Sequence, residues 1–213
     1  RGLGDVYKRQ EFNRLLSSAI SAYGEPELES NKIETQNLEK QQTINNKNYY
    51  LINSLDEIDK WIEDAEEVGE LAVDTETTSL DPHQADLVGI SLCSKIGKAC
   101  YIPVGHKSPK CLKKDAVIKK LKKILEDPSI KKIGQNIKFD FIVFYKCGIT
   151  LSSMEDTMLM SYVLDAGKNR HNMDTLSEIH LGHKTISFKE MVGTGKKEIN
   201  FSEVELDKAK DYA

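Results

Sequence analysis

The sequence predicts an α/β fold in which a mixed central sheet is flanked by helices. Short apolar runs bounded by turn residues alternate with segments whose apolar residues recur at helical spacing. Two of the runs follow each other around a tight turn, as in a hairpin, while helical segments separate the others. With 39% hydrophobic residues and a length of 213, the chain can hold one full domain plus a tail.

The N-terminal part of the chain does not follow this alternation. Residues 1–10 look like a translated sequencing-library adaptor, and we interpret them as an assembly scar without fold information. Residues 11–23 have the apolar spacing of a short helix. Residues 24–47 are rich in Glu, Asn, Gln and Lys and hold no aromatic residue, which is typical of a linker. We therefore expect the folded domain to cover residues 48–213.

The elements of that domain are expected in the following order. Strands are predicted at 49–52, 71–74, 87–93, 99–103 and 132–134. Helices are predicted at 54–67, 115–126, 139–146, 155–164, 173–181 and 203–212. Ser54 is expected to cap the first helix, with Glu57 at the capping-box position. A sheet that begins with consecutive strands and is then wrapped by helices is an arrangement of the ribonuclease-H-like kind.

Composition restricts the class of protein and its location. No apolar run approaches the roughly 20 residues that span a bilayer. No secretory signal is present and the four cysteines lack CxxC spacing, so we expect reduced thiols and a cytoplasmic location without membrane contact. The net charge is only −4, but residues 107–146 hold twelve lysines against four acidic residues. Such a stretch suits an enzyme that attracts a polyanion, or simply a solvated helix face.

An acidic motif, Asp74-Thr75-Glu76-Thr77, closes the apolar strand at 71–74. Side chains two positions apart on a strand share a face, so Asp74 and Glu76 are expected side by side. Two adjacent carboxylates repel each other, and a hard divalent cation such as Mg²⁺ or Mn²⁺ relieves that repulsion. The motif alone is also compatible with ordinary surface carboxylates.

A third carboxylate, Asp140, stands at the start of a predicted helix just after a short apolar strand. If that strand ends beside Asp74, Asp140 reaches the same cleft. Asn136 would then lie in the intervening turn, where it can bind backbone or substrate. The alternative for Asp140 is an acidic residue that favours the first turn of a helix.

Together these segments strongly resemble the 3′→5′ proofreading exonuclease domain of bacterial DNA polymerase I, of family A and the tyrosine type. The matching segments begin at Asp74, Gly134, Asp156 and Arg170 and end with Lys184-Thr185-Ile186-Ser187-Phe188. The resemblance runs from about residue 48 to the end of the chain. It implies a ribonuclease-H-like fold. Residues 11–23 resemble the end of the preceding 5′-nuclease domain.

The resemblance implies hydrolysis assisted by two divalent metal ions, Mg²⁺ or Mn²⁺. Asp74, Glu76 and Asp140 would be metal ligands and catalytic residues. Tyr212 would orient the attacking water, four residues before a last carboxylate. That carboxylate would lie three residues beyond Ala213, so we expect the domain to be truncated at its C-terminus and this chain to have little or no activity.

The resemblance also implies contacts with the substrate, a single-stranded DNA 3′ end or a frayed primer terminus. The residues implied are Leu80, Thr77, Gln135, Asn136, Arg170 and Phe188. Leu80 would wedge against the last base and Phe188 would stack on it, a contact that tolerates any sequence; both residues also suit ordinary packing. We expect a monomer whose covalently linked polymerase domain is not part of these 213 residues.

Two alternatives stay open from the sequence. One is a tyrosine-type exonuclease that trims RNA 3′ ends. The other is a domain that has lost catalysis and serves as a scaffold within its polymerase, although the presence of Asp74, Glu76 and Asp140 argues for an active parent.

Overall fold

The computed structural model describes residues 13–24 and 48–213. The expected assembly scar at 1–10 and all but the first residue of the expected linker at 24–47 lie outside the described residues. Helix α2 (Asn13–Tyr23) agrees with the helix predicted there and belongs to a compact unit of its own. No helix of the described segments is long and apolar enough to cross a membrane.

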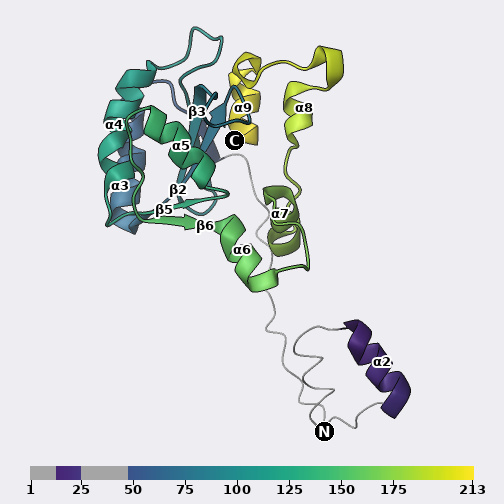
Figure 1. Cartoon of the computed structure of the whole chain (residues 1–213). Helices are drawn as coiled ribbons and strands as arrows, with labels where there is room; N and C mark the ends of the chain where they lie inside the picture. Colours follow the sequence, from purple (N-terminus) through teal and green to yellow (C-terminus); the bar gives the residue numbers. More distant parts are fainter. Residues whose placement is uncertain (1–12, 25–47) are drawn as a thin grey trace. The chain divides into compact units, whose positions relative to one another are not determined.

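Strands from residue 49 onward form one six-stranded mixed sheet (Figure 1). The strands are β1 (Tyr49–Leu51), β2 (Glu70–Thr77), β3 (Leu87–Lys95), β4 (Lys98–Pro103), β5 (Lys131–Gly134) and β6 (Met154–Asp156). Their spatial order is β1-β4-β3-β2-β5-β6, in which β3 is antiparallel to β2 and β4 and every other pair is parallel. The predicted mixed sheet is thereby confirmed, with β2 between β3 and β5.

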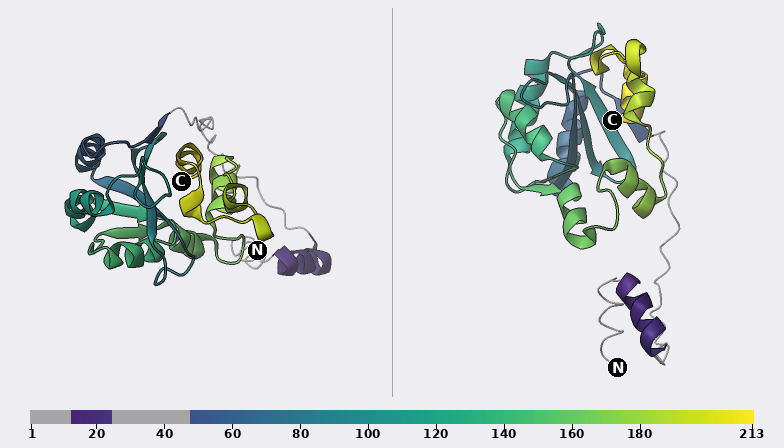
Figure 2. Two further views of the ribbon diagram at one scale, coloured as in Figure 1. Left: turned by 90° about the horizontal axis from the view of Figure 1, so that it is seen from above. Right: turned by 45° about the vertical axis from the view of Figure 1, so that its right-hand side comes forward.

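Helices lie on both sides of this sheet (Figure 2). On one side are α3 (Glu57–Val68), α4 (Lys114–Glu126) and α5 (Lys138–Lys146). On the other are α7 (Met173–Leu181), α8 (Phe188–Val192) and α9 (Leu206–Tyr212), with the short 3₁₀ helices η2 (Gly195–Lys197) and η3 (Phe201–Glu203) between α8 and α9. Helix α6 (Thr157–Asp165) follows β6 at the edge of the sheet.

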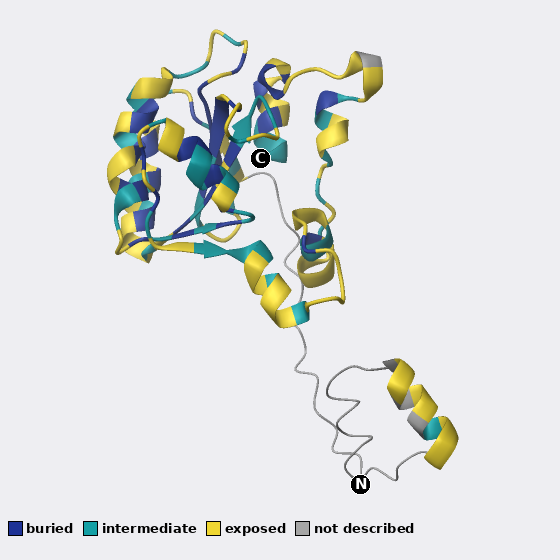
Figure 3. Cartoon of the chain, in the orientation of Figure 1, coloured by how far each residue is buried: buried dark blue, intermediate teal, exposed yellow. Residues whose placement is uncertain are grey.

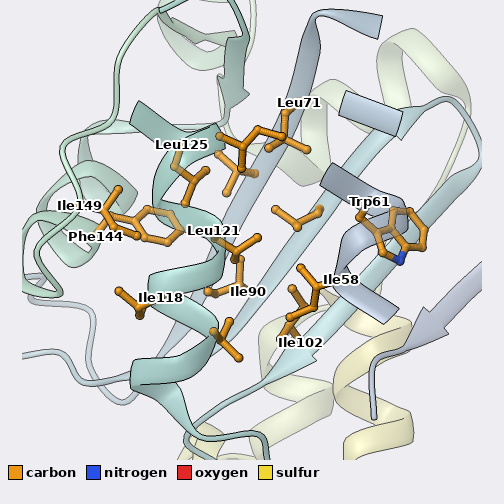
Figure 4. Close-up of a cluster of buried hydrophobic side chains, with 14 of the residues drawn as sticks. Ile58, Trp61, Leu71, Ile90, Ile102, Ile118, Leu121, Leu125, Phe144 and Ile149 are labelled. Atoms are coloured by element: carbon orange, nitrogen blue, oxygen red, sulfur yellow. The ribbon is translucent and has the colours of Figure 1, made fainter. Parts of the chain in front are cut away.

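The main core lies between the sheet and α3, α4 and α5 (Figure 4). Leu71 and Val73 of β2 point into it, together with Ile58 of α3 and Leu121 of α4. Because successive side chains of a strand face opposite ways, the even-numbered residues of β2 face away from this core. The same strand therefore supplies apolar residues to one face and carboxylates to the other.

A smaller apolar cluster covers part of the opposite face. It consists of Val88, Tyr101, Val192, Phe201, Val204 and Ala209, and we call it the site-face cluster. Tyr212 packs against its edge.

Helix α6 differs from this cluster, since no residue of α6 is buried although the helix is apolar (Figure 3). The apolar side chains of this helix, such as Val163, are largely exposed.

Three predicted element starts were wrong by more than one residue. The helix expected from residue 155 begins only at Thr157, because Met154–Asp156 pairs with β5 as strand β6. The helix expected from residue 203 is divided into η3 and α9. Ser54 does not cap α3: its hydroxyl donates to the Glu57 carboxylate at 3.1 Å, and the helix starts at Glu57 itself.

Candidate active site

Asp74 and Glu76 stand on β2 with their side chains on the face away from the main core. In the antiparallel ladder, Asp74 is paired with Ser91 of β3 and Glu76 with Gly89. The register shifts directly after Glu76, which is where a bulge bends the end of a strand. The ladder on one side thus fixes the spacing of both carboxylates.

Asp140 approaches β2 from its other side. Its carboxylate accepts a hydrogen bond of 2.9 Å from the backbone N–H of Thr75 and one of 2.5 Å from the Thr75 hydroxyl. The pairing of β2 with β5 ends at Ala72. Beyond that point Asp140, on the helix that follows β5, accepts from the backbone N–H of Thr75. The structure therefore brings Asp140 to the residue between Asp74 and Glu76, and buries it to 2% exposure.

The turn that delivers Asp140 is held by Asp156. One oxygen of this carboxylate accepts from the backbone N–H of Asn136 and the other from that of Ile137, both at 3.1 Å. The Asp156 carboxylate also caps α6 by accepting from two of its backbone N–H groups. Asn136 itself has a left-handed backbone with φ of 58°, which Asn tolerates better than most residues. Asp156 thus ties the start of α5 to the start of α6.

The carboxylates perturb one another. Burial, followed by repulsion from Asp74 and Asp140, raises the pKa of Glu76 to about 8. Burial also raises the pKa of Asp140, with a further contribution from Asp74, whereas the hydrogen bonds from Thr75 oppose the rise. The pKa of Asp74 is raised by the surrounding protein as well, although water still reaches this side chain and limits the effect. The raised pKa values of these three neighbouring carboxylates favour the approach of a cation.

All three carboxylates offer the hard oxygen donors that Mg²⁺ and Mn²⁺ prefer. No group of three His, Cys, Asp or Glu side chains within the described segments converges closely enough to hold an ion by itself. One oxygen of Asp140 is already engaged by Thr75. The donor chemistry therefore fits a divalent metal, but the ligand set must be completed by water, substrate or a further carboxylate.

Tyr212 lies at the acidic side of the site-face cluster. Its ring centroid is 5.7 Å from that of Phe201 and 6.4 Å from that of Phe188. Burial, then the nearby charges of Glu76 and Asp74, raise the pKa of the Tyr212 hydroxyl. Tyr212 therefore presents a protonated phenol close to the acidic pair.

The predicted substrate residues divide into two groups. Leu80 is 86% exposed and Phe188 is 40% exposed, and Arg170 is also exposed. Gln135 is held at both ends of its amide, which donates to the His171 carbonyl at 2.7 Å and accepts from the Thr157 hydroxyl at 2.6 Å. The Thr77 hydroxyl donates to the Ser79 carbonyl. The side chains of the first group are thus exposed to solvent, whereas those of the second are engaged in hydrogen bonds within the domain.

A groove of about 620 Å³ runs from Asp74 along the sheet towards α6 and α7. Met160 and Leu176 contribute to its apolar lining, and Ala213 borders it. The Ser91 hydroxyl is buried here without a hydrogen-bond partner in the described part of the chain. Asp74 therefore borders an apolar depression whose other lining residues come mainly from β3, α6 and α7.

Sequence reasoning missed several residues of this site. Asp156 carried a usable signal, since Asp directly before an apolar helix is a preferred N-cap. Thr75 lay inside the predicted motif, but its bond to Asp140 depends on where β5 stops.

The mixed sheet and its flanking helices are of the ribonuclease-H-like class, and the comparisons with known proteins specify the family. Residues 49–213 match the family described as 3′-5′ exonuclease, so the chain belongs to that family. The chain is 42% identical over 187 residues to DNA polymerase I of Rhizobium leguminosarum, an alignment that covers 78% of this chain and 18% of the relative. The chain therefore spans less than a fifth of that relative's length.

Solved structures show the same fold. Escherichia coli RNase D, an exoribonuclease involved in structured RNA processing, superimposes with a TM-score of 0.55 at 22% identity, covering 69% of this chain and 36% of RNase D. Brucella melitensis NrnC with bound Mg²⁺ gives a TM-score of 0.51 at 23% identity, covering 76% and 78% of the two chains. These likenesses place the sheet and its helices in one fold class.

Proposed function

We propose that this domain proofreads DNA synthesis by removing 3′-terminal nucleotides from single-stranded DNA, as part of a DNA polymerase I. The observation that carries the proposal is the contact of Asp140 with Thr75, which lies between Asp74 and Glu76 on β2. Membership of the 3′-5′ exonuclease family and the likeness to DNA polymerase I support the reaction class.

In the proposed reaction, a water oxygen forms a bond to the phosphorus of the last phosphodiester. The bond from phosphorus to the 3′ oxygen of the preceding nucleotide breaks, and that oxygen takes up a proton. The product is a nucleoside 5′-monophosphate. Two divalent ions, when bound, would stabilise the negative charge on the attacking and leaving oxygens.

The residues of this chain take the following proposed roles. Asp74, Glu76 and Asp140 would hold the ions, and Thr75 would fix the orientation of Asp140 through its two hydrogen bonds. The Tyr212 hydroxyl would donate to or accept from the attacking water and orient it. Leu80 and Phe188, which are open to solvent, would contact the terminal base.

We further propose that Asp74, Glu76 and Asp140 need a further carboxylate to complete the ligand set, since no group of three His, Cys, Asp or Glu side chains among the described residues could hold an ion. The 213-residue chain should then hydrolyse DNA at least about tenfold more slowly than a chain lengthened by Ala-Glu-Asp-Ala-Asp. Activity of the shorter chain within tenfold of the longer one contradicts this proposal.

The test measures mononucleotide release from a 3′-labelled single-stranded DNA oligonucleotide with Mg²⁺. The lengthened chain should release mononucleotide, and its Asp74→Ala variant should lose more than about a hundredfold in rate. Chelation of the metal should abolish release. An RNA oligonucleotide of the same sequence should be degraded more slowly, and the reverse preference indicates a ribonuclease. No release from either strand by a folded protein indicates a scaffold domain.

A further inference from the structure

Two buried polar residues outside the acidic cluster are hydrogen-bonded to each other. Tyr101 of β4 is 1% exposed, and its hydroxyl lies 2.6 Å from Nε2 of His106, which is 7% exposed. The other ring nitrogen of His106, Nδ1, lies 3.1 Å from the backbone carbonyl oxygen of Val204. A chain of two hydrogen bonds thus connects the sheet to the segment just before α9.

The direction of both bonds follows from the partners. A carbonyl oxygen only accepts, so Nδ1 of His106 must carry the proton and donate to Val204. Burial lowers the pKa of His106, which keeps the ring neutral and leaves Nε2 as an acceptor. The Tyr101 hydroxyl therefore donates to Nε2, and burial raises its pKa so that it keeps its proton. Each polar atom of the pair is matched to one partner.

At one end of these two hydrogen bonds, the Tyr101 ring packs over β3, the strand next to β2. A Cβ added to Gly89 would lie 1.9 Å from the Tyr101 hydroxyl oxygen, so the ring occupies the space that a side chain at this position would fill. Gly89 is the ladder partner of Glu76. The tyrosine hydroxyl is therefore fixed one strand away from a predicted metal ligand.

The His106 end is set against the C-terminal segment, and its neighbour reinforces the contact. The backbone N–H of Lys107 donates to the Ser202 carbonyl at 2.7 Å, and its ammonium group pairs with Glu203 at 2.6 Å. The His106 ring also lies 5.8 Å from that of Phe201, which in turn packs on Tyr212. Helix α9 has only seven residues, and a helix of this length depends on tertiary anchors for its position.

We propose that Tyr101 and His106 are positioning residues, which fix the start of α9 and thereby the place of Tyr212 relative to Glu76. The Tyr101 ring packs over Gly89, and its hydroxyl donates to Nε2 of His106. Nδ1 of His106 in turn donates to the Val204 carbonyl just before α9. The catalytic meaning of this placement rests on the function proposed above, whereas the placement itself does not.

The test follows Tyr212 in the 213-residue chain with 3-fluorotyrosine in place of tyrosine. The fluorine resonance that disappears in Tyr212→Phe belongs to Tyr212. In Tyr101→Phe, which removes one oxygen atom, this resonance should shift by more than its linewidth. Amide hydrogen exchange in α9 should become about fivefold faster, as expected for the loss of one hydrogen bond, while exchange in β2 stays unchanged.

Two matched controls separate positioning from general loosening. Tyr145→Phe removes the same atom from an exposed ring on α5 and should leave the Tyr212 resonance in place. Val192→Ala removes apolar volume from the site-face cluster without touching the hydrogen-bond chain. If Val192→Ala moves the Tyr212 resonance as much as Tyr101→Phe at an equal loss of Tm, the pair is ordinary packing and the proposal fails.

A second pair of variants and one direct measurement complete the test. His106→Asn retains a donor for Val204 and should disturb Tyr212 less than His106→Leu, which retains none. In the unsubstituted protein, the imidazole nitrogen spectrum should show a proton on Nδ1 and none on Nε2 near neutral pH. The opposite tautomer overturns the proposal. None of these measurements uses nuclease activity. They therefore test the positioning role whether or not the proposed function holds.

Discussion

The two faces of the central sheet differ in how completely their side chains are packed. On the α3–α4–α5 face, Ile58, Leu121 and Phe144 are fully buried in a core to which the sheet and all three helices contribute. On the other face, the sheet carries Asp74 and Glu76, an apolar groove and the buried Ser91 hydroxyl, which has no hydrogen-bond partner among the described residues. Both faces are made by the same strands, and β2 contributes alternate residues to each.

The difference indicates a division of labour within the sheet. Burial of apolar surface stabilises a domain by roughly 25 cal/mol per Å², and the tightly packed face supplies most of it. Adjacent carboxylates raise the free energy of the folded state until a cation joins them. The packed face therefore supports an acidic face that lowers stability when no metal is present.

The largest effect is expected on the packed face. Leu121→Ala should lower the free energy of unfolding by about 2–5 kcal/mol, because it removes a fully buried side chain and leaves a cavity. The fluorescence of the single tryptophan, Trp61, which lies in the same core, reports the unfolding transition in urea. A loss below about 1 kcal/mol would mean that this face is no better packed than the other.

Much of the fold could be predicted from the sequence, because the packed face uses regular patterns. The apolar alternation around β3 and β4 and the helical spacing of 115–126 predicted those elements to within a few residues. Strand β6 was missed because Met154-Glu155-Asp156 is not an apolar run, and its pairing with β5 depends on tertiary structure. The short helix α8 was missed because five residues are too few to show helical spacing.

The candidate site was only partly predictable. Asp74 and Glu76 share a motif, so their common face follows from strand geometry alone. The contact between Asp140 and Thr75 spans 65 positions and required knowledge of how β5 lies beside β2. The hydrogen bonds of the Gln135 side chain within the domain were not predictable either. Its partner His171 lies 36 positions away, in the turn before α7.

An intermediate effect is expected from neutralising the acidic face. In the folded, metal-free protein the pKa of Glu76 is raised from its usual 4.5 to about 8. The folded state therefore binds more protons than the unfolded state between these values, and stability falls as the pH rises through that window. Glu76→Gln removes this dependence and should stabilise the protein at pH 8 by about 1–2 kcal/mol, an estimate reduced for the open cleft.

Thermal melts with a chelator at pH 4.5 and pH 8 measure this effect. The Tm of Glu76→Gln should match that of the unsubstituted protein at pH 4.5 and exceed it by roughly 3–6 °C at pH 8. Excess Mg²⁺ at pH 8 should raise the Tm of the unsubstituted protein more than that of the variant. A variant that is less stable at pH 8 without metal would show that the acidic face is not under electrostatic strain.

The smallest effect is expected on α6, where two valines allow a direct comparison. Val163 of α6 is 84% exposed, whereas Val143 of α5 is 1% exposed in the main core. Val143→Ala should cost about 2–3 kcal/mol, since it removes buried methyl groups and leaves a cavity. Val163→Ala should change stability by less than about 0.5 kcal/mol, because Ala has the higher helix propensity and little contact is lost. Equal losses for the two variants in urea unfolding would show that α6 is covered in solution and that the two faces are packed alike.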